Sequence, residues 1–448
     1  MSCIGQSRQD AVSVVRRFGL APFRHLLTPS DFELTAQACG CAPRRRRPLI
    51  PEVVAWLMMY VAMTRTSMTQ GLQSAWGVMR ALCPGLRQAP ITEEAFAKAR
   101  NQLPRRFWIA LWDLMQGRYR STFDSRLRWK DLVVLGGDGT VVDLPNRPAL
   151  VLRFGRPKNG KAERPQPQGR IVALCSVFTG WCHGFVFTPL RITEHQAIQH
   201  LAKTLDRGIL LLLDRGFFSY VTLVLLRQRH THFLIRLSDQ AAGFARRLLK
   251  FGPDDELVEF RPSAALRRRN PQLPERLIYR RIRYQRPGFR ASWLLTSLTN
   301  PKRFSREELI DLYHRRWTIE TVFREWKHTL DIQNLRSHTP AGLSKEVHAQ
   351  ILLHNLVRWL MTEAAQGTQR TPLQFSFRAA LTAVNNAILV IRRSRLHDLH
   401  RLHEELLQDI RQSPIRIRPG RSYPRKGDGC IRNRGNGKHQ LPAKLMSA

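Results

Sequence analysis

Apolar side chains recur every three or four positions along the first 120 residues. The pattern is clear in three segments, DAVSVVRRFGL (10–20), PEVVAWLMMYVAM (51–63) and TEEAFAKARNQLPRRFWIALWDLM (92–115). This spacing puts the apolar residues on one face of a helix. We therefore predict a helical N-terminal region.

From about residue 130 the pattern changes to short apolar runs typical of strands. Three runs, LVVLGGDGTVV, RIVALCSVFTG and GFVFTPLRI, are followed by the helical pattern TEHQAIQHLAKTL. A fully apolar strand, GILLLLD (208–214), then leads into a second helix and a fifth strand, HFLIRLS. Three strands, helix, strand, helix and strand predict an α/β fold, with a mixed sheet and helices packed on its faces.

The remaining sequence divides into three parts. Alternating arginines and apolar residues within 240–300 predict an inserted β subdomain with a basic face. Helices resume at Ser305, where SREE has the form of a capping box. The last stretch is rich in Arg, Gly and Pro, and predicts a flexible basic tail. The expected domains are 1–125 (helical, N-terminal), 126–340 (α/β, with the insertion at about 240–300), 341–410 (helical) and 411–448 (tail).

The charge of the chain identifies a class of partner. Lys and Arg total 73 against 34 Asp and Glu, a formal net charge of +39. So large a surplus favours a nucleic-acid partner, whose counterions are released on binding. The run PRRRRP (43–48) fits either a solvated loop or an element that follows DNA phosphates. Charge alone leaves open a protein that coats RNA.

Cysteine usage and hydropathy favour the cytoplasm. The 7 cysteines are scattered, unlike those of a secreted disulfide framework. The longest apolar run, 53–63, is too short to cross a bilayer, and the first ten residues lack the apolar core of an export signal. We expect a soluble cytoplasmic protein with no membrane partner.

Two acids follow apolar strands, Asp138 in GGDGT and Asp214 in LLLLDRG. Either alone fits a turn-forming or helix-capping Asp. Two like charges on neighbouring strands repel one another unless a cation lies between them. Hard carboxylate oxygens suit Mg²⁺, which keeps open positions for substrate phosphate.

The segment YHRRWTIETVFREWK (313–327) adds a third acid. At 100° per residue, Tyr313, Arg316, Glu320 and Lys327 share one narrow stripe of a helix. Beside this stripe runs an apolar face made of Leu312, Ile319, Phe323, Trp326 and Leu330. An amphipathic helix with Glu320 paired to nearby arginines also explains the stripe, but it leaves the two strand acids unexplained.

These motifs resemble a known family. Tyr313, Arg316, Glu320 and Lys327 have the Y-x2-R-x3-E-x6-K spacing of bacterial insertion-sequence transposases of the YREK subgroup, in the DDE superfamily. DGT at Asp138 and DRG at Asp214 match that family's other two acids. The resemblance implies an RNase H-like core, and a DNA transposase that cleaves element ends and transfers the strands into target DNA.

The resemblance also implies roles for single residues. Asp138, Asp214 and Glu320 would be catalytic and hold two Mg²⁺ or Mn²⁺ ions. Tyr313, Arg316 and Lys327 would contact DNA, and Trp293 in ASWLLTSL would stack on a flipped base or else fill the core. Glu194 in ITEHQ and Arg215 cannot be told from surface charges by sequence.

The expected partner is double-stranded DNA, namely terminal inverted repeats and target DNA, bound by a homodimer associated with the nucleoid. Two other functions remain open from the sequence. One is a non-catalytic DNA-binding regulator or degenerate transposase copy, and the other is a nuclease with the same metal chemistry.

Overall fold

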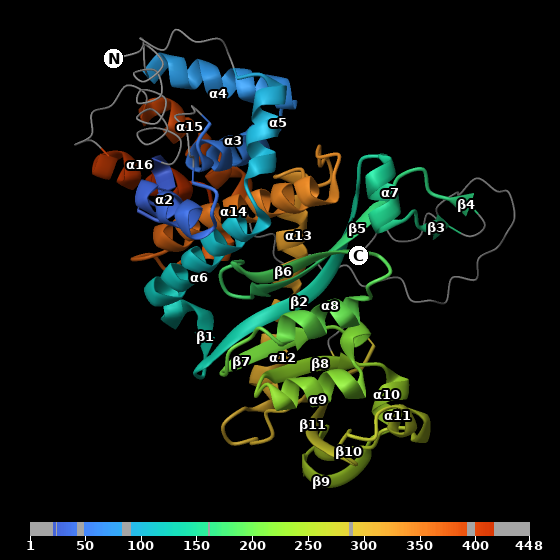
Figure 1. Ribbon diagram of the computed structural model, residues 1–448. Helices are drawn as coiled ribbons and strands as arrows, with labels where there is room; N and C mark the ends of the chain where they lie inside the picture. The colour runs from blue at the N-terminus through green and yellow to red at the C-terminus, as the bar shows by residue number, and fades with distance from the viewer. Residues whose placement is uncertain are drawn as a thin grey trace, which may run out of the picture.

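A computed structural model describes residues 21–23, 25–42, 49–82, 91–159, 162–285, 290–391 and 399–415. The predicted helix at 10–20, the PRRRRP run and most of the basic tail lie outside these residues. Helices from both ends of the chain gather at one end of the molecule, and the sheet extends toward the other (Figure 1).

The centre of the molecule is a mixed β-sheet. Its first five strands lie in the order β6–β5–β2–β7–β8. They are β2 (Leu132–Asp143), β5 (Gln168–Ser176), β6 (Cys182–Pro189), β7 (Ile209–Leu213) and β8 (His232–Leu237). The first three strands in sequence are antiparallel, and β7 and β8 run parallel to β2. In sequence order the spatial arrangement is 3-2-1-4-5, as in an RNase H-like core, so the predicted α/β class is confirmed.

Helices cover both faces of these strands. On one face, α8 (Glu194–Ala202) and α9 (Tyr220–Gln228) bury Ile198, Leu201 and Leu223 against β5, β7 and β8. On the other face lie α12 (Arg306–His314), the 3-10 turn η3 (Arg315–Trp317) and α13 (Thr318–His328). The capping box predicted at the start of α12 is present.

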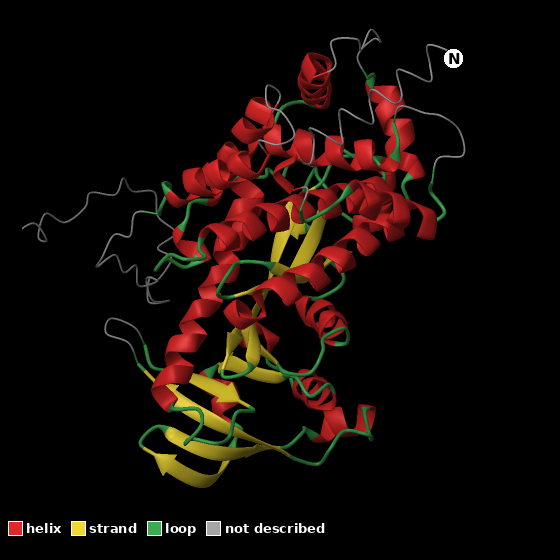
Figure 2. Ribbon diagram, turned by 90° about the vertical axis from the view of Figure 1, so that its left-hand side faces the viewer, coloured by secondary structure: helices red, strands yellow, loops and turns green. Residues whose placement is uncertain are grey.

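The insertion continues the same sheet. Its strands are β9 (Arg246–Gly252), β10 (Asp255–Phe260), β11 (Leu277–Tyr284) and β12 (Ser292–Thr296), joined by the short helices α10 (Asp239–Gly243) and α11 (Ala264–Arg269). Because β12 pairs antiparallel with β8, and β11, β10 and β9 follow in order, the insertion extends the edge of the core. Figure 2 shows the resulting sheet curving away from the helices. Buried Arg280 pairs with Asp255 inside the insertion.

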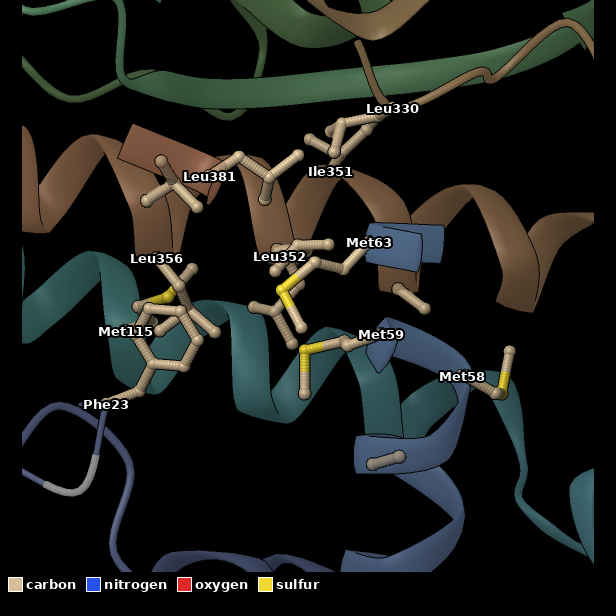
Figure 3. Close-up of a cluster of buried hydrophobic side chains, with 14 of the residues drawn as sticks. Phe23, Met58, Met59, Met63, Met115, Leu330, Ile351, Leu352, Leu356 and Leu381 are labelled. Atoms are coloured by element: carbon tan, nitrogen blue, oxygen red, sulfur yellow. The ribbon is translucent and has the colours of Figure 1, made fainter. Parts of the chain in front are cut away.

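Helices from the two ends of the chain share one apolar core. They are α2 (Pro29–Ala38), α3 (Pro51–Thr64), α4 (Met68–Leu82), α5 (Glu93–Gln102), α6 (Arg105–Leu127), α14 (Pro340–Ala364), α15 (Phe377–Ile391) and α16 (Leu399–Arg411). Helix α14 is buried on nearly all sides, with α3, α6, α15 and α16 around it. Figure 3 shows Met59 and Met63 of α3 beside Leu352 and Leu356 of α14.

Two smaller features complete the fold. The helical pattern at 92–115 forms two helices, because Pro104 lacks an N–H and disfavours helical backbone at Leu103, whose ψ is 117°. The short elements are η1 (Ala21–Phe23), β1 (Arg128–Trp129), α7 (Pro148–Phe154), β3 (Lys158–Asn159), β4 (Ala162–Glu163), η2 (Arg215–Phe217) and η4 (Pro372–Gln374). Among the described residues, no helix combines the length and the apolar character needed to span a bilayer.

Candidate active site

Strand register makes Asp138 and Asp214 neighbours. The parallel pairing of β2 with β7 ends at Gly137 and Leu213, so each acid is the next residue on its strand. Adjacent strands lie about 4.8 Å apart. Unlike the sequence-based expectation, Asp138 does not end its strand, because β2 continues to Asp143 along β5. The two acids therefore stand where β7 leaves the sheet.

Gly139 lets the side chain of Glu194 on α8 lie close to the sheet. A Cβ on Gly139 would lie 2.8 Å from Oε1 of Glu194, closer than real Cβ contacts allow. On the other face, a Cβ on Gly136 would lie 3.5 Å from the carbonyl oxygen of Arg316, which is an ordinary van der Waals distance. The glycine after Asp138 thus leaves room for a further carboxylate beside the site.

Arg316 lies between two of the predicted catalytic acids. Its Nη1 is 3.5 Å from Oδ2 of Asp138, and its Nη2 is 3.1 Å from Oε1 of Glu320, one helical turn later. The Arg316 side chain is 6% exposed, against 24% for Asp138 and 37% for Glu320. A buried guanidinium therefore supplies positive charge at the point where the acids converge.

The surroundings of Asp138 oppose its ionisation. Burial, together with the negative charges of Glu194 and Glu320, raises the pKa of Asp138 to about 6. The backbone N–H of Gly139, which donates to Oδ1 at 2.8 Å, and the charge of Arg316 offset part of this effect. Although burial alone lowers the pKa of Arg316, the nearby Tyr313, Asp214 and Asp138 raise it overall.

The donor set fits a divalent cation. Carboxylate oxygens are the ligands that Mg²⁺ and Mn²⁺ prefer. The pKa of Asp138 is raised mainly by burial and further by the charges of Glu194 and Glu320, and a cation bound beside the carboxylate would favour its ionised form. The three acids surround Arg316 without forming a closed chelate. Within the described ranges, only one group of three potential ligands has all its atoms within 4.8 Å of one another, and it lies elsewhere, at Glu363.

The structure places Tyr313 inside the protein. Its side chain is almost fully buried, and its hydroxyl donates to the carbonyl oxygen of Leu213 at 3.3 Å. Burial raises the pKa of Tyr313, which keeps the hydroxyl protonated as a hydrogen-bond donor. The residue thus ties α12 to the backbone beside Asp214, and its hydroxyl is not presented to solvent as the predicted DNA contact requires.

Lys327 and Trp293 remain partly exposed. Lys327 is seven residues beyond Glu320, and its pKa is lowered by burial, although the charge of Asp143 opposes this shift. Trp293 on β12 is half-buried, with the guanidinium carbons of Arg281 and Arg283 at 4.6 and 5.7 Å from its ring centroid. Two arginines thus lie over the ring of Trp293, whereas the charged neighbour of Lys327 is an acid.

The motif ITEHQ drew attention to Glu194, but the sequence alone could not separate this residue from a surface charge. Its carboxylate lies beside Gly139, contributes to the raised pKa of Asp138, and faces Nε of Arg170 at 3.5 Å. The signal that could have identified it is its place as the first residue of the helix after the third strand, above the small residue Gly139. The proximity of Glu194 to Gly139 depends on how the strands pair, which cannot be read from the sequence alone.

Comparisons with known proteins agree with this architecture. Residues 130–356 match the family described as Transposase DDE domain. The chain is 25% identical over 428 residues to Transposase InsG for insertion sequence element IS4 of Escherichia coli (strain K12), covering 94% of this chain and 93% of that protein. It also resembles the piggyBac transposase of a synaptic complex with hairpin DNA, with a TM-score of 0.42 and 11% identity, over 90% and 87% of the two chains.

Proposed function

This chain belongs to the Transposase DDE domain family, and on that premise we propose that Asp138, Asp214 and Glu320 form its active site. The chain is a DNA transposase of the insertion-sequence type, as is its relative from Escherichia coli. We propose that the three acids hold two Mg²⁺ or Mn²⁺ ions, and that the YREK residues place the chain in that subgroup.

One observation carries the assignment. Asp138 and Asp214 occupy adjacent register positions on parallel strands, and Arg316 joins Asp138 to Glu320 across the helix packed above them. These contacts support a site in which acids from three distant parts of the chain act together. Burial and like charge raise the pKa of Asp138, which is the electrostatic setting that a bound cation relieves.

Each side chain has a distinct part in the proposed reaction. When bound, the metal ions activate the attacking oxygen and stabilise the leaving oxygen at the scissile phosphate. Arg316 neutralises the acids before the ions bind, and afterwards its guanidinium is free to hold a phosphate oxygen. Tyr313 keeps the backbone at Leu213 in place and so orients Asp214. We thus propose a positioning role for Tyr313 in place of a DNA contact.

DNA binding rests on the basic surface around the site. Lys327 lies ~10 Å along the helix from Glu320, about three nucleotide steps of B-DNA. We propose that it binds a phosphate beside the cut, and that Trp293 stacks on a base held out of the duplex. We propose further that the helices of 1–125 recognise terminal inverted repeats, that a homodimer pairs two ends, and that the protein associates with the nucleoid.

The test is a cleavage and strand-transfer assay on DNA carrying the inverted repeats that flank the coding frame. Asp138→Asn, Asp214→Asn and Glu320→Gln should each abolish Mg²⁺- or Mn²⁺-dependent nicking, since each removes a ligand charge. End binding should persist, because it depends on the cationic surface. Asp206→Asn, at an exposed position paired with Arg120, is the matched control.

The assay separates the alternatives. Nicking by any of the three variants at the wild-type rate would contradict the active-site assignment. Cleavage without joining to target DNA would indicate a nuclease, and end binding without cleavage by the wild-type chain would indicate a regulator or degenerate copy.

A further inference from the structure

Three potential metal ligands lie close together among the helices that share the apolar core, in a place separate from Asp138, Asp214 and Glu320. His25 follows η1, Glu363 lies in the last turn of α14, and His403 lies on α16. Nε2 of His25 is 3.1 and 3.2 Å from the two oxygens of Glu363, and Nε2 of His403 is 3.5 Å from Oε2 of the same carboxylate. The imidazole rings meet edge to face, with centroids 4.6 Å apart.

These separations match the geometry of a tetrahedral zinc ion. Ligand atoms at 2.0–2.1 Å from Zn²⁺ in tetrahedral directions are about 3.3 Å from one another. The distances from the two Nε2 atoms to the oxygens of Glu363 lie between 3.1 and 3.5 Å, close to this value. The three ligand atoms all lie within 4.8 Å of one another.

The ligand types select the metal. Imidazole nitrogen suits Zn²⁺, whereas Mg²⁺ and Mn²⁺ favour oxygen donors. Two histidines and one glutamate form a common three-ligand zinc set, with a water in the fourth position. We propose that His25, Glu363 and His403 bind one zinc ion, in a site separate from the proposed catalytic one.

The surroundings suit an ion that enters from solvent. The side chains of Glu363, His403 and His25 are 16%, 24% and 40% exposed, so the site is sheltered at the carboxylate and open at His25.

The site joins three remote segments of the chain. It links the residues before α2 and the C-terminal helix α16 to the end of α14, the helix around which both ends of the chain pack. Zinc bound here would stabilise the packing of these three segments, because an ion that binds only the native state stabilises that state by mass action. This proposal does not depend on the proposed function.

The experiment titrates the full-length, reduced protein with Co²⁺ and Zn²⁺ in excess Mg²⁺, which occupies oxygen-donor sites. We expect one equivalent of Co²⁺ with tetrahedral absorption bands, displaced by Zn²⁺. We also expect a melting temperature about 3 °C higher at a zinc concentration 100 times the Kd. His403→Ala should weaken binding at least about tenfold, by analogy with the loss of other ligand-supporting groups.

The control is His400→Ala, which removes an exposed imidazole from the same helix and should change neither binding nor melting. His25→Gln, on an exposed turn, provides a second ligand variant if His403→Ala fails to fold. Unchanged Co²⁺ affinity in either ligand variant, or octahedral Co²⁺ bands in the wild type, would overturn the proposal.

Discussion

Asp138→Asn should stabilise the metal-free protein while abolishing its proposed chemistry. Burial and the charges of Glu194 and Glu320 raise the pKa of Asp138 from 3.8 to about 6. The native state thus holds this proton more tightly than the unfolded chain does, and stability falls as the pH rises through 3.8 and toward 6. Asparagine has nearly the same shape, can accept the Gly139 N–H, and carries no charge.

The size of the effect follows from linkage. The difference between the two pKa values corresponds to about 3 kcal/mol of unfolding free energy at pH 8 and about 2 kcal/mol at pH 5. For a chain of this size, 3 kcal/mol raises the melting temperature by about 3 °C. The gain should shrink as the pH falls, because the wild-type carboxyl then becomes neutral too.

The assay compares thermal melts of the wild type and the variant at pH 5 and pH 8, with chelator and then with Mg²⁺ or Mn²⁺. Added metal should stabilise the wild type more than the variant, since only the wild type has the full set of carboxylates. Asp206→Asn, whose side chain is 70% exposed, should change neither profile by more than about 0.5 kcal/mol. A variant equal to or less stable than the wild type at pH 8 in chelator would refute the electrostatic reasoning.

Two further predictions concern other parts of the molecule. Trp293→Ala should impair second-strand cleavage more than first-strand nicking on labelled end DNA, and equal loss of both steps would remove the base-stacking role. Glu325→Gln should destabilise the fold by about 3–5 kcal/mol in denaturant titrations, because buried Arg358 loses its carboxylate partner. The exposed Glu405→Gln should change stability by less than ~1 kcal/mol, and a similar loss in both variants would contradict the burial argument.

Local patterns predicted those features that depend on neighbours in the sequence. The apolar face of the 313–327 segment is buried as the helical spacing indicates, with Leu312, Ile319 and Trp326 each at most 3% exposed. The capping box at Ser305 and the five core strands were likewise predicted from local sequence patterns. The position of a residue around the helix axis, however, gives the direction of its side chain and does not show how deeply that side chain is buried. Tyr313 therefore looked like a DNA contact, although its hydroxyl is buried against the backbone of Leu213.

Features set by distant pairing could not be predicted in this way. Nothing in the insertion indicates that β12 pairs with β8, because a strand does not encode its partner in its own pattern. For the same reason, the sequence could not predict that Glu194 lies beside Gly139, or that helices from both ends of the chain share one core. The proposed triad was predicted from motif spacing, but the position of the Arg316 guanidinium between two of its acids follows only from the tertiary arrangement.

The shared helical core constrains how the protein matures during synthesis. Helices α3 and α6 pack against α14, which begins at Pro340. At about 5–20 residues per second, the ribosome completes α14 roughly 10 to 50 s after α6. During that interval the apolar surfaces of α3 and α6 that contact α14 lack their native partner, although the N-terminal helices can pack against one another. A product that stops before α14 would therefore leave these surfaces exposed to aggregation or proteolysis.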